Sequence, residues 1–139
     1  MEEGFIVIDH TADIGIEAYG ATIEALFANA ATGLFSLITD LNKIREVEQK
    51  QIQLTAEDAE ILLVEWLNEL IYTFEVDHIV FKRFEIEELT ENRIQACCFG
   101  QYINPKYNVL KREIKAATYH MLRISKDNDG YKVTVIFDI

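Results

Sequence analysis

The most constraining feature of the chain is an apolar stripe that recurs every three or four residues between Ile23 and Ile38. This spacing is typical of a helix with one buried face. Thr22 stands where a helix N-cap is expected, and Glu24 follows in the first turn, where the helix dipole favours an acid. We therefore expect a helix over about Ile23–Ile38. Three small residues should let it lie close against a sheet: Ala30, Ala31 and Gly33.

A second apolar segment predicts a longer helix over about Ala56–Phe74. The residues Thr55–Asp58 match a capping box, in which a Thr side chain and an acid three residues later satisfy the first amides of a helix. The segment is too apolar for a lone surface helix, so we expect it at the centre of the fold. Its tryptophan, Trp66, is expected in the core.

The remaining apolar segments form short runs or alternate, as β-strands do. Phe5–Ile8 is a continuous apolar run that predicts a buried strand, whereas residues 79–89 follow a period of two with a bulge expected near Phe81. A hairpin is expected at Asp127–Gly130. Further strands are expected over residues 14–19, 47–54, 93–102, 114–124 and 131–138. Two helices among six to eight mostly antiparallel strands predict an α+β fold, with residues 1–139 forming one domain.

The composition argues against several classes of function. The chain has 139 residues and a net charge of −11, from 13 basic and 24 acidic side chains. Because nucleic-acid affinity depends largely on Lys and Arg, direct binding to RNA or DNA is not expected. No apolar run approaches the roughly 20 residues that span a bilayer, and the N-terminus lacks the basic and apolar regions of a signal peptide. We therefore expect a cytoplasmic protein without membrane contact.

Acidic residues gather near both ends of the chain. Asp9–Asp13 is a polar break between two apolar segments, and Asp138 precedes the terminal carboxylate of Ile139. Taken alone, Asp13 is better interpreted as a turn residue, and Asp138 as the polar end of a strand. If the fold brings the two ends together, their carboxylates form the oxygen-rich site that Mg²⁺ or Ca²⁺ prefers. This meeting of the two ends is our main hypothesis.

The histidines and cysteines favour structural interpretations. None of His10, His78 and His120 has a partner at a spacing typical of zinc ligands. His120 alternates with apolar positions, as a core histidine would. Cys97 and Cys98 are adjacent, which is a poor geometry for a disulfide, and at least one of them is expected in the core.

The chain lacks the complete motifs of a self-contained enzyme. It has no P-loop, no nucleophile elbow and no dinucleotide-binding glycine motif. Lys115 has two interpretations: it is a solvated lysine, or it is a cation that contacts a partner or a phosphate near the acidic site.

Four short motifs, in order along nearly the whole chain, resemble the signatures of the archease family. They are Asp9–Ile16, Trp66–Tyr72, Lys115–His120 and Phe137–Asp138. The resemblance implies a small α+β protein with a strand-helix-strand-strand module. It also implies a non-catalytic activator of the GTP-dependent RNA-splicing ligase that joins tRNA exon halves. Such an activator promotes guanylylation of the ligase's active-site histidine and allows multiple turnovers.

The same resemblance implies a set of site residues. The family's metal site carries over to Asp13 and Asp138, with the terminal Ile139 supplying an oxygen, and Lys115 matches the family's functional lysine. The expected cofactor is a divalent cation, Ca²⁺ or Mg²⁺, with Mn²⁺ as a further candidate, and the expected partner is the ligase. Two alternatives stay open. One is a metal-dependent phosphoester hydrolase with His10 as the nearby general base; the other is a general chaperone or modulator of RNA-processing enzymes.

Overall fold

The computed structural model describes residues 4–9, 13–104 and 106–139. The two helices of this part of the chain are α1 (Ile23–Ile38) and α2 (Ala59–Asp77), and a short 3-10 helix, η1 (Leu41–Lys43), follows α1. The strands are β1 (Phe5–Asp9), β2 (Ile14–Gly20), β3 (Glu48–Thr55), β4 (Ile79–Leu89), β5 (Arg93–Tyr102), β6 (Ala116–Ala117), β7 (Ser125–Asp127) and β8 (Gly130–Asp138). The predicted α+β class is confirmed.

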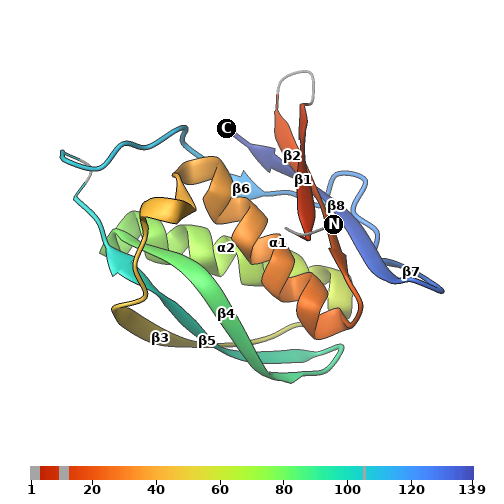
Figure 1. Cartoon of the computed structure of the whole chain (residues 1–139). Coiled ribbons are helices and arrows are strands. Elements are labelled where there is room, and N and C mark those ends of the chain that lie inside the picture. Colours follow the sequence, from red (N-terminus) through yellow and green to blue (C-terminus); the bar gives the residue numbers. More distant parts are fainter. Residues whose placement is uncertain (1–3, 10–12, 105) are drawn as a thin grey trace.

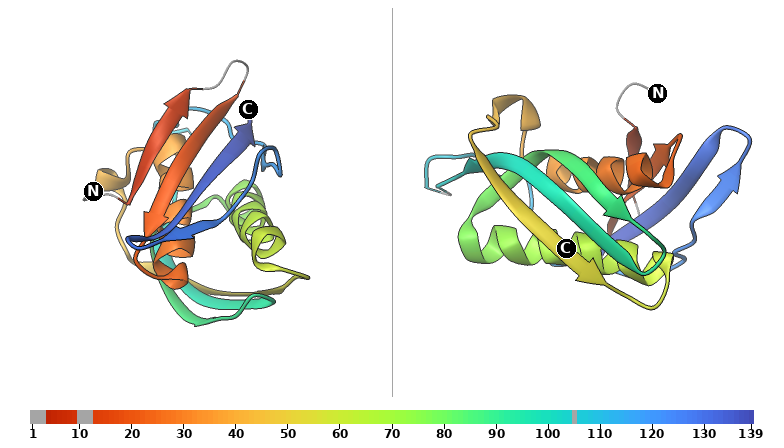
Figure 2. Two further views of the ribbon diagram at one scale, coloured as in Figure 1. Left: turned by 90° about the vertical axis from the view of Figure 1, so that its right-hand side faces the viewer. Right: turned by 90° about the horizontal axis from the view of Figure 1, so that it is seen from below.

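The strands form two antiparallel sheets, and both helices lie between them (Figures 1 and 2). The larger sheet has the order β1-β2-β8-β6, with β7 paired to β8 outside that path. The smaller sheet has the order β3-β5-β4. A single core of buried side chains from both sheets and both helices fills the space between the layers. No helix in the described part of the chain is long and apolar enough to cross a bilayer.

Helix α1 confirms the prediction made from its apolar stripe. It begins and ends at the predicted residues, and the Thr22 hydroxyl accepts the N–H of Ala25 at 3.1 Å. The small residues also act as expected. A Cβ atom added to Gly33 would lie 2.9 Å from Ile16 Cδ1 and 3.2 Å from the Phe5 ring, so the helix approaches the larger sheet closely there. Glycine is therefore the residue that permits this contact.

Helix α2 begins three residues later than predicted, and the capping box is wrong. Thr55 is the last residue of β3, where it pairs with Arg93 of β5. The N-cap is Asp58, whose carboxylate accepts the N–H of Ile61 at 2.9 Å. The pairing of Thr55 in the sheet takes precedence over its capping tendency. Trp66 is fully buried, as predicted, and its indole N–H donates to the carbonyl of Phe27 in α1 at 3.1 Å.

Two strand predictions also need correction. Phe5–Ile8 is not a buried strand: β1 is an edge strand paired to β2, and Ile6 and Val7 are 41% and 49% exposed. The long strand predicted over residues 114–124 contracts to β6, because the chain turns after it and Met121 adopts a left-handed backbone with φ 53°. His120 lies in that irregular segment and is exposed, so its prediction as a core histidine is wrong.

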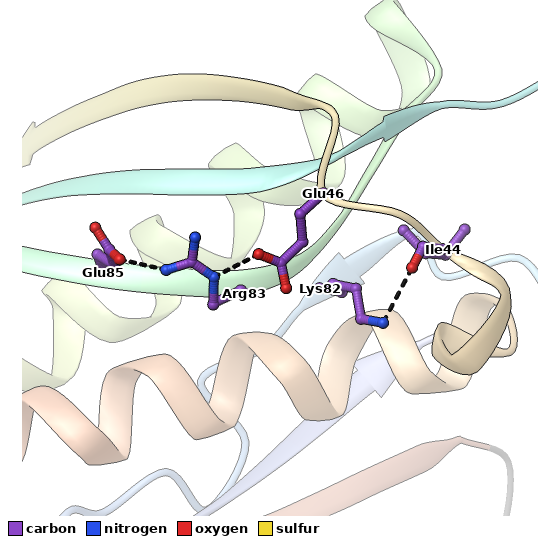
Figure 3. Close-up of polar contacts among 5 residues, drawn as sticks. All are labelled: Ile44, Glu46, Lys82, Arg83 and Glu85. Atoms are coloured by element: carbon purple, nitrogen blue, oxygen red, sulfur yellow. Dashed lines mark hydrogen bonds and ion pairs between the residues drawn. The ribbon is translucent and has the colours of Figure 1, made fainter.

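The bulge predicted near Phe81 is present, between Phe81 and Arg83 of β4. Side chains next to it hold the segment that leads into β3 (Figure 3). Arg83 Nε donates to Glu46 Oε1 at 2.6 Å, and its guanidinium also contacts Glu85. Lys82 Nζ donates to the carbonyl of Ile44 at 3.0 Å. Exposed ion pairs of this kind contribute little to stability, so we assign these contacts to local positioning.

Both cysteines are buried in β5. Cys98 is fully enclosed, and this burial raises the pKa of its thiol well above the ordinary value. Cys97 is 5% exposed on the other face of the strand, where burial and the carboxylates of Glu87 and Glu85 raise its pKa as well. A protonated thiol is a weak nucleophile, so both residues serve as small apolar side chains.

Candidate functional site

The larger sheet brings together the two ends of the chain. Strand β8 pairs with β2 in antiparallel register, with Ile14 opposite Phe137. Continued by one residue, that register sets position 13 opposite position 138. Figures 1 and 2 show the C-terminal end of β8 beside the ends of β1 and β2. The sheet thus provides the neighbourhood that the main hypothesis required.

Lys115 reaches the same place through β6. Ala116 pairs with Asp138 of β8, and the backbone N–H of Lys115 donates to the Asp138 carbonyl at 2.8 Å. The side chains of Lys115 and Asp138 are exposed, and Asp13 is half-buried. The sheet therefore brings Asp13, from the start of the chain, to the end that Lys115 and Asp138 occupy. We call Asp13, Lys115, Asp138 and Ile139 the acidic end.

The acidic end stands on a rigid base. Phe137, which precedes Asp138 in β8 and pairs with Ile14, is fully buried, and Ile136 is 2% exposed. The Thr118 backbone N–H and hydroxyl both contact the Ile136 carbonyl, at 3.0 and 2.8 Å. On the side of β6 away from β8, the amide of Asn68 in α2 bonds to the backbone of Ala117. Asn68 lies in a motif noted in the sequence, but its polar side chain on an apolar helix was the only signal of this contact.

The neighbouring cations have structural partners. Lys111 Nζ donates to the Ser36 carbonyl at 3.1 Å, and Arg112 Nη1 donates to the Leu37 carbonyl at 3.3 Å. These carbonyls belong to the last turn of α1, which has no basic residue of its own. Cations are stabilising at a helix C-terminus, so Lys111 and Arg112 supply from a distant segment what the helix lacks. The backbone N–H of Lys115 makes the bond to Asp138, and the backbone N–H of Lys111 likewise donates to the Ile38 carbonyl at 2.7 Å.

Tyr119 lies two residues after the end of β6 and contacts α2. Its hydroxyl donates to Glu65 Oε1 at 3.4 Å. Partial burial and the nearby negative charge of Glu65 raise the pKa of this tyrosine, so the phenol stays protonated at neutral pH. The contact ties the Tyr119 loop to the helix that also carries Asn68.

The donor chemistry of the acidic end fits a hard divalent cation. The carboxylates of Asp13 and Asp138 are oxygen donors of the kind that Ca²⁺, Mg²⁺ and Mn²⁺ accept. Across residues 4–9, 13–104 and 106–139, no group of three or more His, Cys, Asp or Glu side chains is placed to hold a metal. A site here therefore depends on two side-chain carboxylates and further oxygens. The metal role of Asp13, Asp138 and Ile139 stays a prediction, and His10 lies outside the described residues.

Known proteins resemble this chain over nearly its whole length. A family model described as "Archease protein family (MTH1598/TM1083)" matches residues 5–139. The archease of Methanosarcina mazei is 42% identical over 136 residues, which cover 95% of this chain and 93% of the relative. The archease of Saccharolobus solfataricus is 38% identical over 136 residues, covering 97% and 98%.

Solved structures show the same fold. The solution structure of protein 1598 of Methanobacterium thermoautotrophicum matches with a TM-score of 0.83 and 31% identity, covering 99% of both chains. The crystal structure of an archease from Thermotoga maritima matches with a TM-score of 0.61 and 26% identity, covering 95% of this chain and 94% of that one. The chain belongs to the archease family.

Proposed function

We propose that this chain is a non-catalytic, cytoplasmic activator of a GTP-dependent RNA-splicing ligase, and that it acts through its acidic end. The observation that carries the proposal is the convergence of β2, β8 and β6, which brings Lys115 to the Asp138 carbonyl and the Asp13 position across from Asp138. Membership of the archease family supports the choice of partner. The activator promotes guanylylation of the ligase and permits multiple turnovers.

In this proposal Asp13, Asp138 and the carboxylate of Ile139 would hold a divalent cation, Ca²⁺ or Mg²⁺, with Mn²⁺ as a further candidate. A bound cation would supply concentrated positive charge at the edge of the ligase's nucleotide pocket. Asp13 is half-buried and immediately precedes the first paired residue of β2, Ile14. Its position next to the sheet favours it as the more rigid of the two ligands. Asp138 is exposed and can face the partner.

The exposed ammonium group of Lys115 contacts the partner or a nucleotide phosphate. Its backbone is anchored by the bond to Asp138, so the side chain leaves the sheet from a defined point. An ammonium group binds phosphate as a compact point charge. Replacing Lys115 with methionine keeps most of the aliphatic side chain and removes the charge. The Lys115→Met variant should therefore activate the ligase less than the wild type.

The net charge of −11 supports docking on a basic protein surface and disfavours direct contact with RNA. Association with the ligase is expected to slow as salt is added, because opposite charges steer the encounter. The ligase, which handles the RNA itself, provides the basic surface in this proposal.

The test compares guanylylation and turnover of the ligase with and without this protein. The wild-type protein should raise both, and Asp138→Ala should remove most of the effect. Asp129→Ala is the matched control, because Asp129 is an exposed aspartate in the turn at the other end of β8. Unchanged ligase turnover with the wild-type protein would refute the proposal. Phosphoesterase activity of the isolated protein that is lost in Asp13→Asn would support the hydrolase alternative instead.

A further inference from the structure

The strand that brings Lys115 to the acidic end is very short. β6 consists of Ala116 and Ala117, and one of its sides pairs with β8. Within the described residues, the bonds from Lys115 to Asp138 and from Thr118 to Ile136 extend this pairing by one residue on each side. A strand of this length is not stable in isolation. A contact on the side of β6 that faces away from β8 is therefore needed to stabilise the strand.

Asn68 of α2 occupies that other side. Its Oδ1 accepts the N–H of Ala117 at 2.8 Å, and its Nδ2 donates to the carbonyl of Ala117 at 3.3 Å. A primary amide offers one acceptor and donors in a plane, as a peptide group does. The Asn68 side chain therefore takes the place that a neighbouring strand would have in the sheet.

The backbone of Asn68 is itself fixed. Trp66, two residues earlier, is fully buried and bonded to α1, and Leu67 and Leu70 are also fully buried. The amide group thus extends from a rigid helix to a two-residue strand. This arrangement transmits the position of α2 to β6 and from β6 to the Lys115 backbone.

We propose that Asn68 is a positioning residue of the acidic end, which sets Lys115 beside Asp138 by holding β6 against β8. The inference rests on the proposed function of the acidic end as the part that activates the ligase. Residues that orient the groups of a functional site in this way typically change its activity by about 10- to 100-fold when they are replaced.

Two variants and a control test the role. Asn68→Ala removes both bonds to Ala117, whereas Asn68→Asp keeps the acceptor and loses the donor at neutral pH. Asn92→Ala is the matched control, because the Asn92 amide also bonds twice to the backbone, donating to the carbonyls of Ala56 and Glu57 at 3.2 and 2.8 Å. Those contacts lie at the entrance to α2, away from the larger sheet.

The first readout is local. Amide hydrogen exchange measured by NMR should accelerate at Lys115 and Ala117 in Asn68→Ala and stay as in the wild type in Asn92→Ala. In Asn68→Asp the introduced carboxyl should titrate above the ordinary aspartate pKa of about 3.9, because only its neutral form can donate to Ala117. This titration would report the Asn68 contact even if Asn68→Ala fails to fold.

The second readout is functional. Ligase guanylylation is measured against the concentration of this protein, which separates the half-saturating concentration from the maximal rate. Asn68→Ala should lower the maximal rate about tenfold or more and leave the half-saturating concentration unchanged, because the docking surface is intact. If the lower maximal rate came only from a general loss of stability, Asn92→Ala would lower the maximal rate as much as Asn68→Ala.

Equal loss of the maximal rate in Asn68→Ala and Asn92→Ala would overturn the positioning role. So would unchanged exchange at Lys115 and Ala117, or an ordinary pKa of the introduced carboxyl. If the wild-type protein does not activate the ligase, the proposed function fails by itself. The exchange measurements still decide in that case whether Asn68 positions β6.

Discussion

Replacing Trp66 with phenylalanine should destabilise the protein by about 3 kcal/mol. Phenylalanine lacks the indole N–H, which in the wild type donates to the Phe27 carbonyl at 3.1 Å, and loss of such a bond costs about 1 kcal/mol. It also lacks two further carbons of a fully buried ring, worth about 0.8 kcal/mol each, and leaves a cavity between the two helices. In the wild type, Trp66 makes an edge-to-face contact with Phe84 at a centroid distance of 5.9 Å, and the phenylalanine ring can keep this contact.

The assay is urea unfolding followed by far-ultraviolet circular dichroism. Fluorescence does not serve, because Trp66 is the only tryptophan of the chain. The melting temperature should fall by about 10 °C for a domain of this size. Tyr102→Phe is the control: Tyr102 is 52% exposed, and its replacement should change stability by less than about 0.5 kcal/mol. A loss below about 1 kcal/mol for Trp66→Phe would refute the close packing of the two helices, since the hydrogen bond alone accounts for that much.

Three further substitutions have distinct expected outcomes. Asp58→Ala should cost about 1 kcal/mol in urea unfolding, because the N–H of Ile61 loses its cap. Gly100→Ala should cost about 3 kcal/mol or prevent accumulation of folded protein, since the added Cβ would lie 1.8 Å from the Val80 carbonyl oxygen; normal stability would contradict this geometry. Above pH 9.0, the ordinary pKa of the thiol, Cys98 ionises in the unfolded chain while burial keeps it protonated in the folded protein. The unfolded state then binds fewer protons, so the wild type should lose about 1.4 kcal/mol per pH unit relative to Cys98→Val, and equal pH slopes would count against burial of the thiol.

The sequence was most informative where local and tertiary preferences agree. Helix α1 was predicted closely because its cap at Thr22 and its apolar stripe indicate the same boundaries. At Thr55 the two preferences conflict: the capping motif is present, but pairing with Arg93 keeps the residue in β3. Exposure of β1 was missed because an apolar run does not reveal whether a strand has one neighbour or two.

The meeting of the two chain ends was predicted, the contacts that support it were not, and the metal role of these residues stays a prediction. The two ends could be predicted to meet because both carry carboxylates, which a divalent cation would bring together. The register of β2 with β8 does bring them to one end of the sheet. The long strand predicted around His120 failed because alternation of apolar residues does not show a left-handed turn at Met121. The contact of Asn68 with Ala117 joins positions 49 residues apart, which no local pattern reveals.

The position of β8 has a consequence for how the protein is made. It follows the other strands of the described residues along the chain, yet it lies between β2 and β6 in the sheet. During synthesis, one edge of β2 therefore stays open until β8 leaves the ribosome, and pairing of Ile14 with Phe137 closes a very long loop. An open apolar edge invites pairing with other chains, so slow completion exposes the nascent protein to aggregation. A chain interrupted before β8 therefore lacks the strand that brings the residues of the acidic end together.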